Sequence, residues 1–492
     1  MIFTSPRFLA FLLVLLVLMA LVQRREANKR LLTLASCFFY AAWDWRYLGL
    51  LLAVSVVDFV AANKIVAARS PVFKKRWLAM SIVSNLGVLG YFKYNNFFIE
   101  NFNALTSWFG FTIPMANILL PAGISFYTFK TMSYTIDVYR GELEVCRSWL
   151  DYAMFITFFP ELIAGPIVRG SIFLPQMQRR IGPTFERLIS GSSLFLLGVI
   201  KKLFIADRLS GIADTFFASP DLFDAASTWC GVLAYTLQIY CDFAGYSDMA
   251  IGVARMIGYD LPENFRMPYL SGSITEFWRR WHMTLSSWLR DYLYIPLGGS
   301  RHGVLKTYRN LFLTMLLGGL WHGASWNFVF WGGLHGCALA GHKLWTRWSG
   351  GKWSVPRLPA WLLTFTFVVL CWVPFRSRSF ADTLTIFRSL AGFGPGHYQF
   401  LPVWLFRCLV LCILGHLLGY LWFERSADLP PGRASTWLLR SLGLRIENNP
   451  VSGTFVVPGQ VTVCGVYSLV FILLMLFFFA PLNTSPFIYF QF

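Results

Sequence analysis

The stretch "GGLWHGASWNFVFWGGLHG", residues 318–336, places two histidines in one of the most apolar parts of the chain. Each of them, His322 and His335, follows a bulky apolar residue and precedes a glycine. No charged residue occurs between Arg309 and Lys343. An uncharged segment of this length predicts helices inside a membrane, where each imidazole needs a hydrogen-bond partner or a wet cavity.

The composition of the whole chain is that of a membrane protein. Of its 492 residues, 56% are hydrophobic and only 13% are charged, whereas about a quarter of the residues in soluble domains are charged. Several apolar runs approach the roughly 20 residues that cross a bilayer as a helix, so we predict an all-α polytopic protein with about ten or eleven transmembrane helices and additional re-entrant or interfacial helices. The runs are 8–22, 47–62, 77–91, 188–200, 361–373, 403–422 and 461–479.

No linker divides the chain, and residues 1–492 are predicted to form a single integral-membrane domain. Its parts are N-terminal helices (1–115), a core that carries the motifs (116–345) and C-terminal helices (346–492). Basic residues follow the run 8–22 rather than precede it, which favours a retained helix over a signal peptide. The net charge of +18 comes from Lys and Arg clusters between apolar runs. Such clusters suit anionic lipids, and nucleic-acid binding is not predicted.

The segment around the two histidines is too long for one span. The 32 uncharged residues 311–342 would extend about 48 Å as a straight helix. Gly318-Gly319 and Gly332-Gly333 offer breaks, so we expect two shorter helical pieces or one broken helix. On a continuous helix His335 would lie about 20 Å from His322, which favours a packing role for His335.

A second unusual stretch is "ITEFWRRWHMTLSSWLRDYLYIPLGG", residues 274–299. Its apolar residues have the spacing of one helical face and predict an amphipathic helix that lies in the interface or re-enters the bilayer, with tryptophans at headgroup depth. These residues are Trp278, Trp281, Leu285, Trp288 and Leu289. His282 lies among them and is either a site residue or a solvated headgroup contact. The neighbouring arginines suit a phosphate or carboxylate, or serve as lipid anchors.

Motifs of soluble enzymes are absent: the chain has no phosphate loop, no G-x-S-x-G and no H-E-x-x-H. Among the seven histidines, His302 and His342 stand in a loop signal and at a helix end, and we expect both to be solvated. His322 is the histidine best placed to take a proton from a hydroxyl group near neutral pH. The alternative for His322 is a hydrogen bond to a backbone carbonyl that holds two helices together.

Taken together, "FWRRWHMTLSSWLRDYLYIPLGGSRHG" (277–303) and residues 318–336 resemble the membrane-bound O-acyltransferases. Within that family the chain is similar to the bacterial branch that includes the membrane subunit of alginate O-acetylation and its relatives in cellulose and peptidoglycan acetylation. The likeness extends through "LPAGISFYTFKTMSYTIDVYRG" (120–141), "FFPELIAGPIVR" (158–169), "YCDFAGYSDMAIG" (240–252), "CWVPFRS" (371–377) and "FIYFQF" (487–492).

The resemblance implies a bundle of tilted helices in which a cytoplasmic funnel and an extracytoplasmic opening meet near the catalytic histidine. His322 matches that histidine, and His282 matches a second polar position that is His or Asn across the superfamily. Glu161 departs from the Gln or neutral residue expected there, and a buried, ionised Glu161 would need a partner such as Arg169. Residues expected to bind substrate are Trp278, Arg280, Trp281, Trp321 and Asn327; Trp321, Asn327 and His282 are the candidate donors to an oxyanion.

The implied activity is O-acetyl transfer from a cytoplasmic thioester donor, such as acetyl-CoA, to an extracytoplasmic polysaccharide resembling alginate or cellulose. Transfer is direct or uses a periplasmic partner of the SGNH-hydrolase type, and the protein is expected in the bacterial inner membrane with no bound cofactor or metal. D-alanyl transfer to teichoic acid and a non-enzymatic glycan or lipid transporter are the alternatives. A haem or metal protein is also conceivable, but no histidine spacing supports it.

Overall fold

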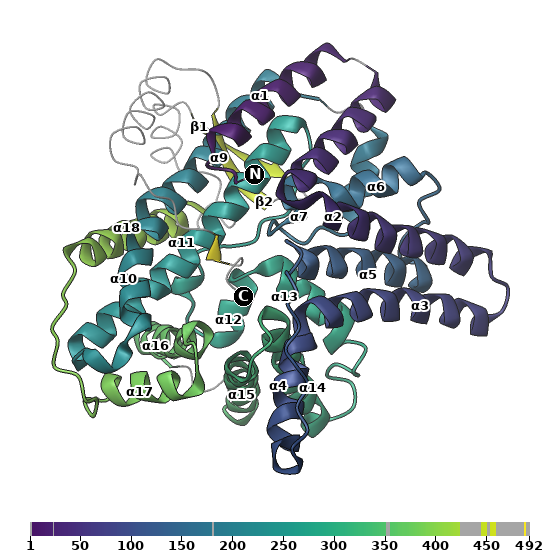
Figure 1. Ribbon diagram of the computed structural model, residues 1–492. Helices are drawn as coiled ribbons and strands as arrows, with labels where there is room; N and C mark the ends of the chain where they lie inside the picture. Colours follow the sequence, from purple (N-terminus) through teal and green to yellow (C-terminus); the bar gives the residue numbers. More distant parts are fainter. Residues whose placement is uncertain are drawn as a thin grey trace. The chain divides into compact units, whose positions relative to one another are not determined.

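A computed structural model describes residues 2–22, 24–179, 182–350, 355–423, 444–449, 453–458 and 487–488. These residues are mostly helical, as predicted, with one antiparallel hairpin of β1 (Leu444–Asn449) and β2 (Gly453–Pro458) (Figure 1). The predicted span 461–479 and most of "FIYFQF" lie outside the described residues. The chain forms two compact units: unit 1 is Met1–Phe195 with Met249–Pro262, and unit 2 is Leu196–Asp248 with Glu263–Phe492.

Unit 1 contains three helices, α2, α3 and α5, that lie side by side (Figure 1). The runs 33–43 and 47–62 both belong to α2, which leaves helical geometry at Asp44 (φ −158°, ψ 114°). The helices of the unit are α1 (Pro6–Leu21), α2 (Arg25–Ala67), α3 (Pro71–Leu89), α4 (Asn95–Thr106), α5 (Ile124–Arg140), α6 (Trp149–Thr157), α7 (Phe159–Leu162), α8 (Gly170–Phe173) and most of α9 (Phe185–Val199).

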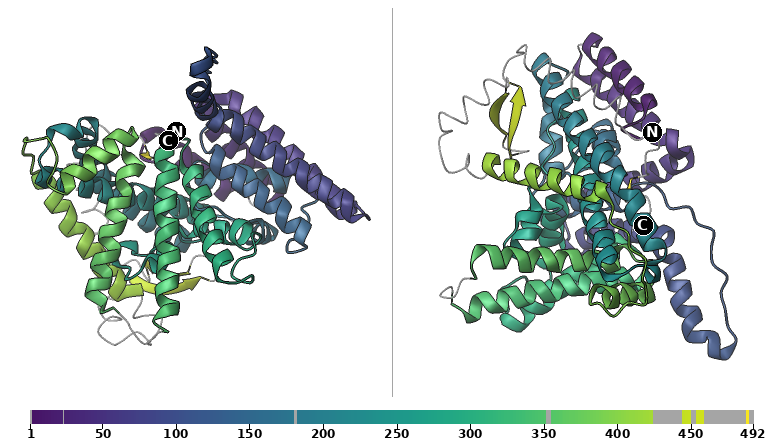
Figure 2. Two further views of the ribbon diagram at one scale, coloured as in Figure 1. Left: turned by 90° about the horizontal axis from the view of Figure 1, so that it is seen from below. Right: turned by 90° about the vertical axis from the view of Figure 1, so that its left-hand side faces the viewer.

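Helix α4 and the segment that returns from it form an arm that extends beyond the other helices of unit 1 (Figure 2). Two asparagines join the arm's two sides. The Asn96 side chain both donates to and accepts from the backbone of Ala116 (2.9 and 3.1 Å), and Asn103 does the same with Ile113 (2.8 Å each). These four hydrogen bonds satisfy the backbone N–H and C=O groups of Ala116 and Ile113, which belong to a segment that forms no helix or strand.

Unit 2 contains the segments with the two histidine stretches. Its longest helix, α11 (Ala225–Ile257), continues beyond the unit into the segment 249–262. The other helices are α10 (Asp207–Ala218), α12 (Ile274–Arg280), α13 (Met283–Leu289), α14 (Val304–His322), α15 (Trp326–Trp348), α16 (Arg357–Arg376), α17 (Phe380–Leu390) and α18 (Val403–Phe423).

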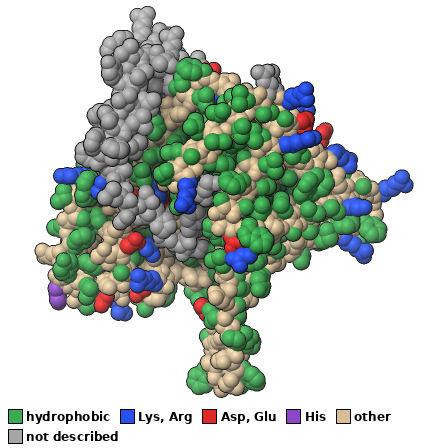
Figure 3. Space-filling view, turned by 45° about the horizontal axis from the view of Figure 1, so that its top comes forward, with side chains coloured by type: hydrophobic (Ala, Val, Ile, Leu, Met, Phe, Trp, Pro, Cys, Tyr) green, Lys and Arg blue, Asp and Glu red, His purple; other side chains and the backbone are tan. Residues whose placement is uncertain are grey.

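Four of the described helical segments are long and apolar enough to cross a membrane: Arg25–Ala67, Phe185–Ala218, Arg357–Arg376 and Val403–Tyr420. Figure 3 shows many hydrophobic side chains on the surface of the described residues, with Lys and Arg side chains scattered among them. A multi-pass membrane protein is therefore supported, while the number of ten or eleven spans stays a prediction.

The segment 311–342 does form two helices, but the predicted position of the break is wrong. Helix α14 ends at His322 and α15 begins at Trp326, so the turn is at residues 323–325. The glycine pairs instead let the two antiparallel helices approach closely. A Cβ on Gly319 would lie 2.2 Å from the carbonyl oxygen of Phe328, and one on Gly332 would lie 2.4 Å from that of Met315.

The prediction of one amphipathic helix in 274–299 is also wrong. The chain leaves helical geometry between α12 and α13, and a π-helical turn, Arg290–Tyr294, follows α13. The apolar side chains assigned to a lipid-facing stripe are buried inside the protein, from Trp281 at 1% exposure to Trp278 at 8%. The helical spacing correctly identified the buried side chains, but it did not show that protein rather than lipid covers them.

Candidate active site

His322 is the last residue of α14 and lies in a cage of aromatic rings. Its ring centroid is 4.9 Å from that of Trp321, 5.1 Å from that of Trp331 and 5.3 Å from that of Phe375, all in edge-to-face geometry. The side chain is almost fully buried. The turn after His322 and the close glycine contacts of α14 and α15 bring Trp331 against the imidazole.

His282 lies beside His322, as the sequence predicted. Their ring centroids are 6.5 Å apart, and the His282 ring is 6.2 Å from Trp321 and 4.7 Å from Phe243. His282 connects α12 to α13 with left-handed backbone angles (φ 43°, ψ 55°) and is fully buried. A non-glycine residue keeps this conformation only where its surroundings enforce it, and such positions concentrate at functional sites.

Asn264 holds the strained segment in place. Its main-chain oxygen accepts a hydrogen bond from the N–H of Met283 (2.9 Å). Its side-chain Oδ1 accepts from the N–H and the hydroxyl of Thr284 (3.3 and 2.9 Å) and lies 3.2 Å from Nδ1 of His282. Its Nδ2 donates to the Ser247 hydroxyl (3.2 Å). One buried side chain therefore fixes both the backbone and the imidazole of His282.

His335 lies closer to His322 than continuous-helix geometry suggested. Both rings contact Trp331, with centroid distances of 4.7 Å from His335 and 5.1 Å from His322. The expected 20 Å separation is wrong because the chain turns back immediately after His322. The indole N–H of Trp278 donates to Nδ1 of His335 (3.2 Å). His335 is thus packed against Trp331, the same ring that contacts His322.

The other predicted site residues differ in whether they contact the rings of His282 and His322. Trp321 contacts both His282 and His322. Trp281 is buried against Trp372 (5.0 Å between centroids). The guanidinium of Arg280 pairs with Glu276 (2.9 Å), and the amide of Asn327 donates to the carbonyl of Ser377 (2.9 Å). Substrate binding by these residues stays a prediction.

Comparison with known proteins gives the family. The chain is 47% identical over 397 residues, 80% of its length, to the probable alginate O-acetylase of Azotobacter vinelandii, and the match covers 79% of that relative. The chain belongs to the membrane-bound O-acyltransferase family. The family model, described as MBOAT, membrane-bound O-acyltransferase family, matches residues 142–357. That range includes His282, His322 and His335.

Two further relatives of this acyltransferase act on other polymers, as their names state. The peptidoglycan O-acetyltransferase of Helicobacter pylori is 37% identical over 80% of this chain and 80% of its own length. The teichoic acid D-alanyltransferase of Bacillus subtilis is more distant, with 27% identity over 54% of this chain and 71% of its own length. The family assignment confirms the predicted fold class and makes the chain an acyltransferase.

Residues 487–488, within the motif "FIYFQF", are buried in unit 2 of the acyltransferase against α11. The N–H of Ile488 donates to the carboxylate of Asp242 (2.6 Å), which also pairs with Lys202 (2.6 Å). The ring of Phe487 lies 4.5 Å from that of Tyr246. A buried carboxylate is thereby paired with a cation and with the main chain, as burial in an apolar medium requires.

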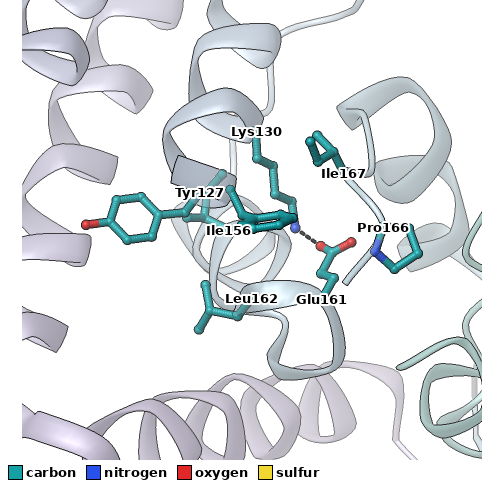
Figure 4. A pocket seen from close by; sticks show the side chains of 8 residues that line it. Tyr127, Lys130, Ile156, Glu161, Leu162, Pro166 and Ile167 are labelled. Atoms are coloured by element: carbon teal, nitrogen blue, oxygen red, sulfur yellow. Dashed lines mark ion pairs between the residues drawn. The ribbon is translucent and has the colours of Figure 1, made fainter. Parts of the chain in front are cut away.

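Unit 1 of the acyltransferase has a small, mostly apolar cavity that Glu161 helps to line. The sequence suggested Arg169 as a partner for this carboxylate, but its partner is Lys130 of α5, as the dashed line in Figure 4 shows. The Lys130 ammonium also donates to the Phe155 carbonyl and lies 4.3 Å from the centre of the Phe155 ring. The cavity beside the pair measures about 10 Å³, which is space for a single water.

Two functional candidates escaped the sequence reasoning. Asn264, in "PENFRMP", was not singled out, since a lone Asn gives no sign of which residue it will contact. Lys130 carried a clearer signal, because it is the single charge between Glu100 and Asp137 and a buried cation needs an anion. Among the described residues, no group of three or more His, Cys, Asp or Glu side chains is arranged to hold a metal ion.

Proposed function

We propose that this acyltransferase transfers acetyl groups to hydroxyl groups of an extracytoplasmic polysaccharide, and that the reaction takes place at His322. The observation that carries the proposal is the convergence of His322, His282 and Trp321 within the family-matched range, with 6.5 Å between the two imidazole centroids. Acetyl transfer is favoured over D-alanyl transfer because the acetylating relatives match more of the chain at higher identity.

His322 serves as the general base in this proposal. Its imidazole takes the proton of an acceptor hydroxyl, and the hydroxyl oxygen attacks the carbonyl carbon of an acetyl thioester. The tetrahedral intermediate collapses with cleavage of the carbon–sulfur bond, and the thiol leaves with the proton from His322. General base catalysis of this kind contributes about 10²–10⁴-fold to the rate.

Trp321 is the proposed donor to the oxyanion. Its ring adjoins both imidazoles, and an indole N–H can only donate a hydrogen bond. The amide of Asn327 already donates to the Ser377 carbonyl, which makes it the weaker candidate. Trp278, Trp281 and Arg280 are retained as residues that shape the substrate path around this centre.

The proposed donor is acetyl-CoA from the cytoplasm of a bacterium in whose inner membrane the protein lies. The basic clusters between the apolar runs would attract the phosphates of such a donor. We also propose that the acetyl group reaches the polymer directly or through a periplasmic partner of the SGNH-hydrolase type. Both routes begin with the same thioester cleavage at His322.

The test uses inside-out membrane vesicles from cells that make the polymer, with de-O-acetylated polymer enclosed in the lumen and labelled acetyl-CoA added outside. The wild-type protein is expected to place alkali-labile label on the enclosed polymer. A His322→Ala variant present at the same level in the membrane should place about 10²–10⁴-fold less. Equal labelling by the variant would refute the assignment of His322.

A further inference from the structure

The amide of Asn264 has one possible orientation. The backbone N–H of Thr284 can only donate, so the Asn264 atom 3.3 Å from it must be the oxygen, Oδ1. The Thr284 hydroxyl also reaches this oxygen, at 2.9 Å. The nitrogen of the amide then faces the Ser247 hydroxyl at 3.2 Å, which accepts its hydrogen bond. The Thr284 N–H therefore decides where the oxygen of Asn264 lies, and the two hydroxyl contacts are compatible with that orientation.

This orientation decides which nitrogen of His282 carries the proton. Nδ1 of His282 lies 3.2 Å from the Asn264 oxygen, and two acceptors cannot share a hydrogen bond. Nδ1 must therefore be the donor. In the neutral imidazole the other nitrogen, Nε2, then has a lone pair and no hydrogen. A neutral His282 can accept a hydrogen bond at Nε2 but cannot donate one there, which removes it from the candidate oxyanion donors.

The backbone around His282 is arranged to keep this geometry. Met283, the residue after His282, donates its N–H to the main-chain oxygen of Asn264 (2.9 Å), and Arg266 donates to the carbonyl of Arg280 (2.9 Å). The left-handed conformation of His282 is thus enforced on both sides. Asn264 contributes to the main-chain contact and the side-chain contact at once.

We infer that Asn264 is a positioning residue that fixes the Nδ1–H form of His282, so that Nε2 accepts a hydrogen bond from the hydroxyl group of the acyl acceptor. This inference rests on the proposed function. His282 orients the hydroxyl, His322 removes its proton, and the indole of Trp321 is left to stabilise the oxyanion. A substrate hydroxyl is the ligand class that fits an acceptor nitrogen beside a general base.

The kinetic test compares three variants in the vesicle assay with labelled acetyl-CoA. Asn264→Leu removes the acceptor for Nδ1–H and is expected to lower kcat by about 10²–10⁴-fold, the scale observed elsewhere when a catalytic histidine loses its tautomer-setting partner, while KM for acetyl-CoA stays within about twofold. Asn264→Asp keeps an acceptor oxygen and should recover most of the rate. Ser247→Ala is the matched control: it removes a partner of Asn264 but leaves the contact with His282, so the rate should change by less than about threefold.

A direct measurement on the wild-type protein needs no activity. In proteoliposomes with ¹⁵N-labelled histidine, His282, assigned by its absence in His282→Gln, is expected to show a protonated Nδ1 and an unprotonated Nε2. A proton on Nε2 overturns the inference, as does an Asn264→Leu variant with wild-type kcat. Absence of transfer by the wild type from acetyl-CoA would instead contradict the proposed donor, and the nitrogen spectrum would still decide the state of His282.

Discussion

His282 and His335 are both fully buried in unit 2. The ring of His282 lies beside that of His322, whereas His335 contacts Trp331, which in turn contacts His322. Their partners give them opposite proton positions. Nδ1 of His282 donates to the amide oxygen of Asn264, whereas Nδ1 of His335 accepts from the indole N–H of Trp278. His282 therefore carries its proton on Nδ1 and His335 on Nε2.

The difference shows that burial alone does not assign a role to a histidine. The partner of His282 is an amide that also holds a strained backbone, and the lone pair of the neutral imidazole lies on Nε2, the nitrogen away from that amide. The partner of His335 is a tryptophan, and the rings around it belong to a packed aromatic layer that includes Phe277 and Trp331. In the proposed mechanism His282 is the hydrogen-bond acceptor beside the general base His322, whereas His335 belongs to the packed aromatic layer.

Replacing each histidine with leucine is expected to separate these roles most strongly. His282→Leu removes the acceptor for the substrate hydroxyl and should lower the transfer rate by about 10²–10⁴-fold. His335→Leu acts on His322 only through Trp331, so its rate should fall by about tenfold or less. Initial rates in vesicles, normalised to folded protein, provide the measurement. Equal losses for the two variants would contradict the distinction.

The buried ion pair of unit 1 extends the comparison from neutral to charged groups. Lys130→Met leaves the Glu161 carboxylate buried without its partner and should destabilise the protein by about 3–5 kcal/mol. The double variant Lys130→Met/Glu161→Gln removes both charges and should recover most of that loss. Unfolding of the purified protein in detergent measures both, and equal instability of the single and double variants would refute a pairing role.

Helices α14 and α15 bring His322 and His335 to the same tryptophan, Trp331. The close packing of these helices depends on Gly332 more than on its neighbour Gly333. A Cβ on Gly332 would lie 2.4 Å from the carbonyl oxygen of Met315, whereas one on Gly333 has no atom nearer than 3.8 Å. Gly332→Ala should therefore cost about 1–3 kcal/mol. Gly333→Ala, the matched control, should be neutral or slightly stabilising, since alanine favours helix. Similar unfolding midpoints for the two variants would contradict this packing.

The smallest effect is expected when the partner of His335 is removed. Trp278→Phe takes away the indole N–H, but His335 can move its own proton to Nδ1, so the net cost should be about 0.5–1.5 kcal/mol. Because phenylalanine keeps an aromatic ring at this position of the proposed substrate path, the rate of acetyl transfer should stay within about threefold of wild type. Trp345→Phe, at a partly exposed position of α15, controls for loss of indole volume. A rate loss as large as that of His282→Leu would make His335 part of the reaction centre.

Much of the fold class could be predicted because membrane helices follow from apolar length and charge distribution alone. The buried faces of 274–299 were also visible, since the spacing of Trp278, Trp281 and Leu285 is helical. The break between α12 and α13 was not visible. The break depends on the left-handed conformation of His282, which is held by Asn264, 18 positions away in the chain. The periodicity of apolar residues in a single sequence does not reveal contacts between such distant positions.

The two histidines of the candidate site were named from the sequence, but the geometry around them was not, and their catalytic roles stay a prediction. The family resemblance pointed to His322 and His282, and the structure brings them together. The position of His335 was misjudged because the 20 Å separation assumed a continuous helix, whereas the chain turns directly after His322. A glycine in an apolar helix can either break the helix or let a second helix pack closely against it. Which of the two occurs depends on the facing helix.

The most direct test of the central claim is the acetyl ester content of the polymer made by cells whose only copy of the protein carries His322→Ala, compared with His335→Asn. Both proteins must be present in the membrane at the wild-type level. The account predicts polymer without acetyl esters for His322→Ala and substantial acetylation for His335→Asn. Polymer acetylated to the wild-type extent by the His322→Ala cells would contradict it.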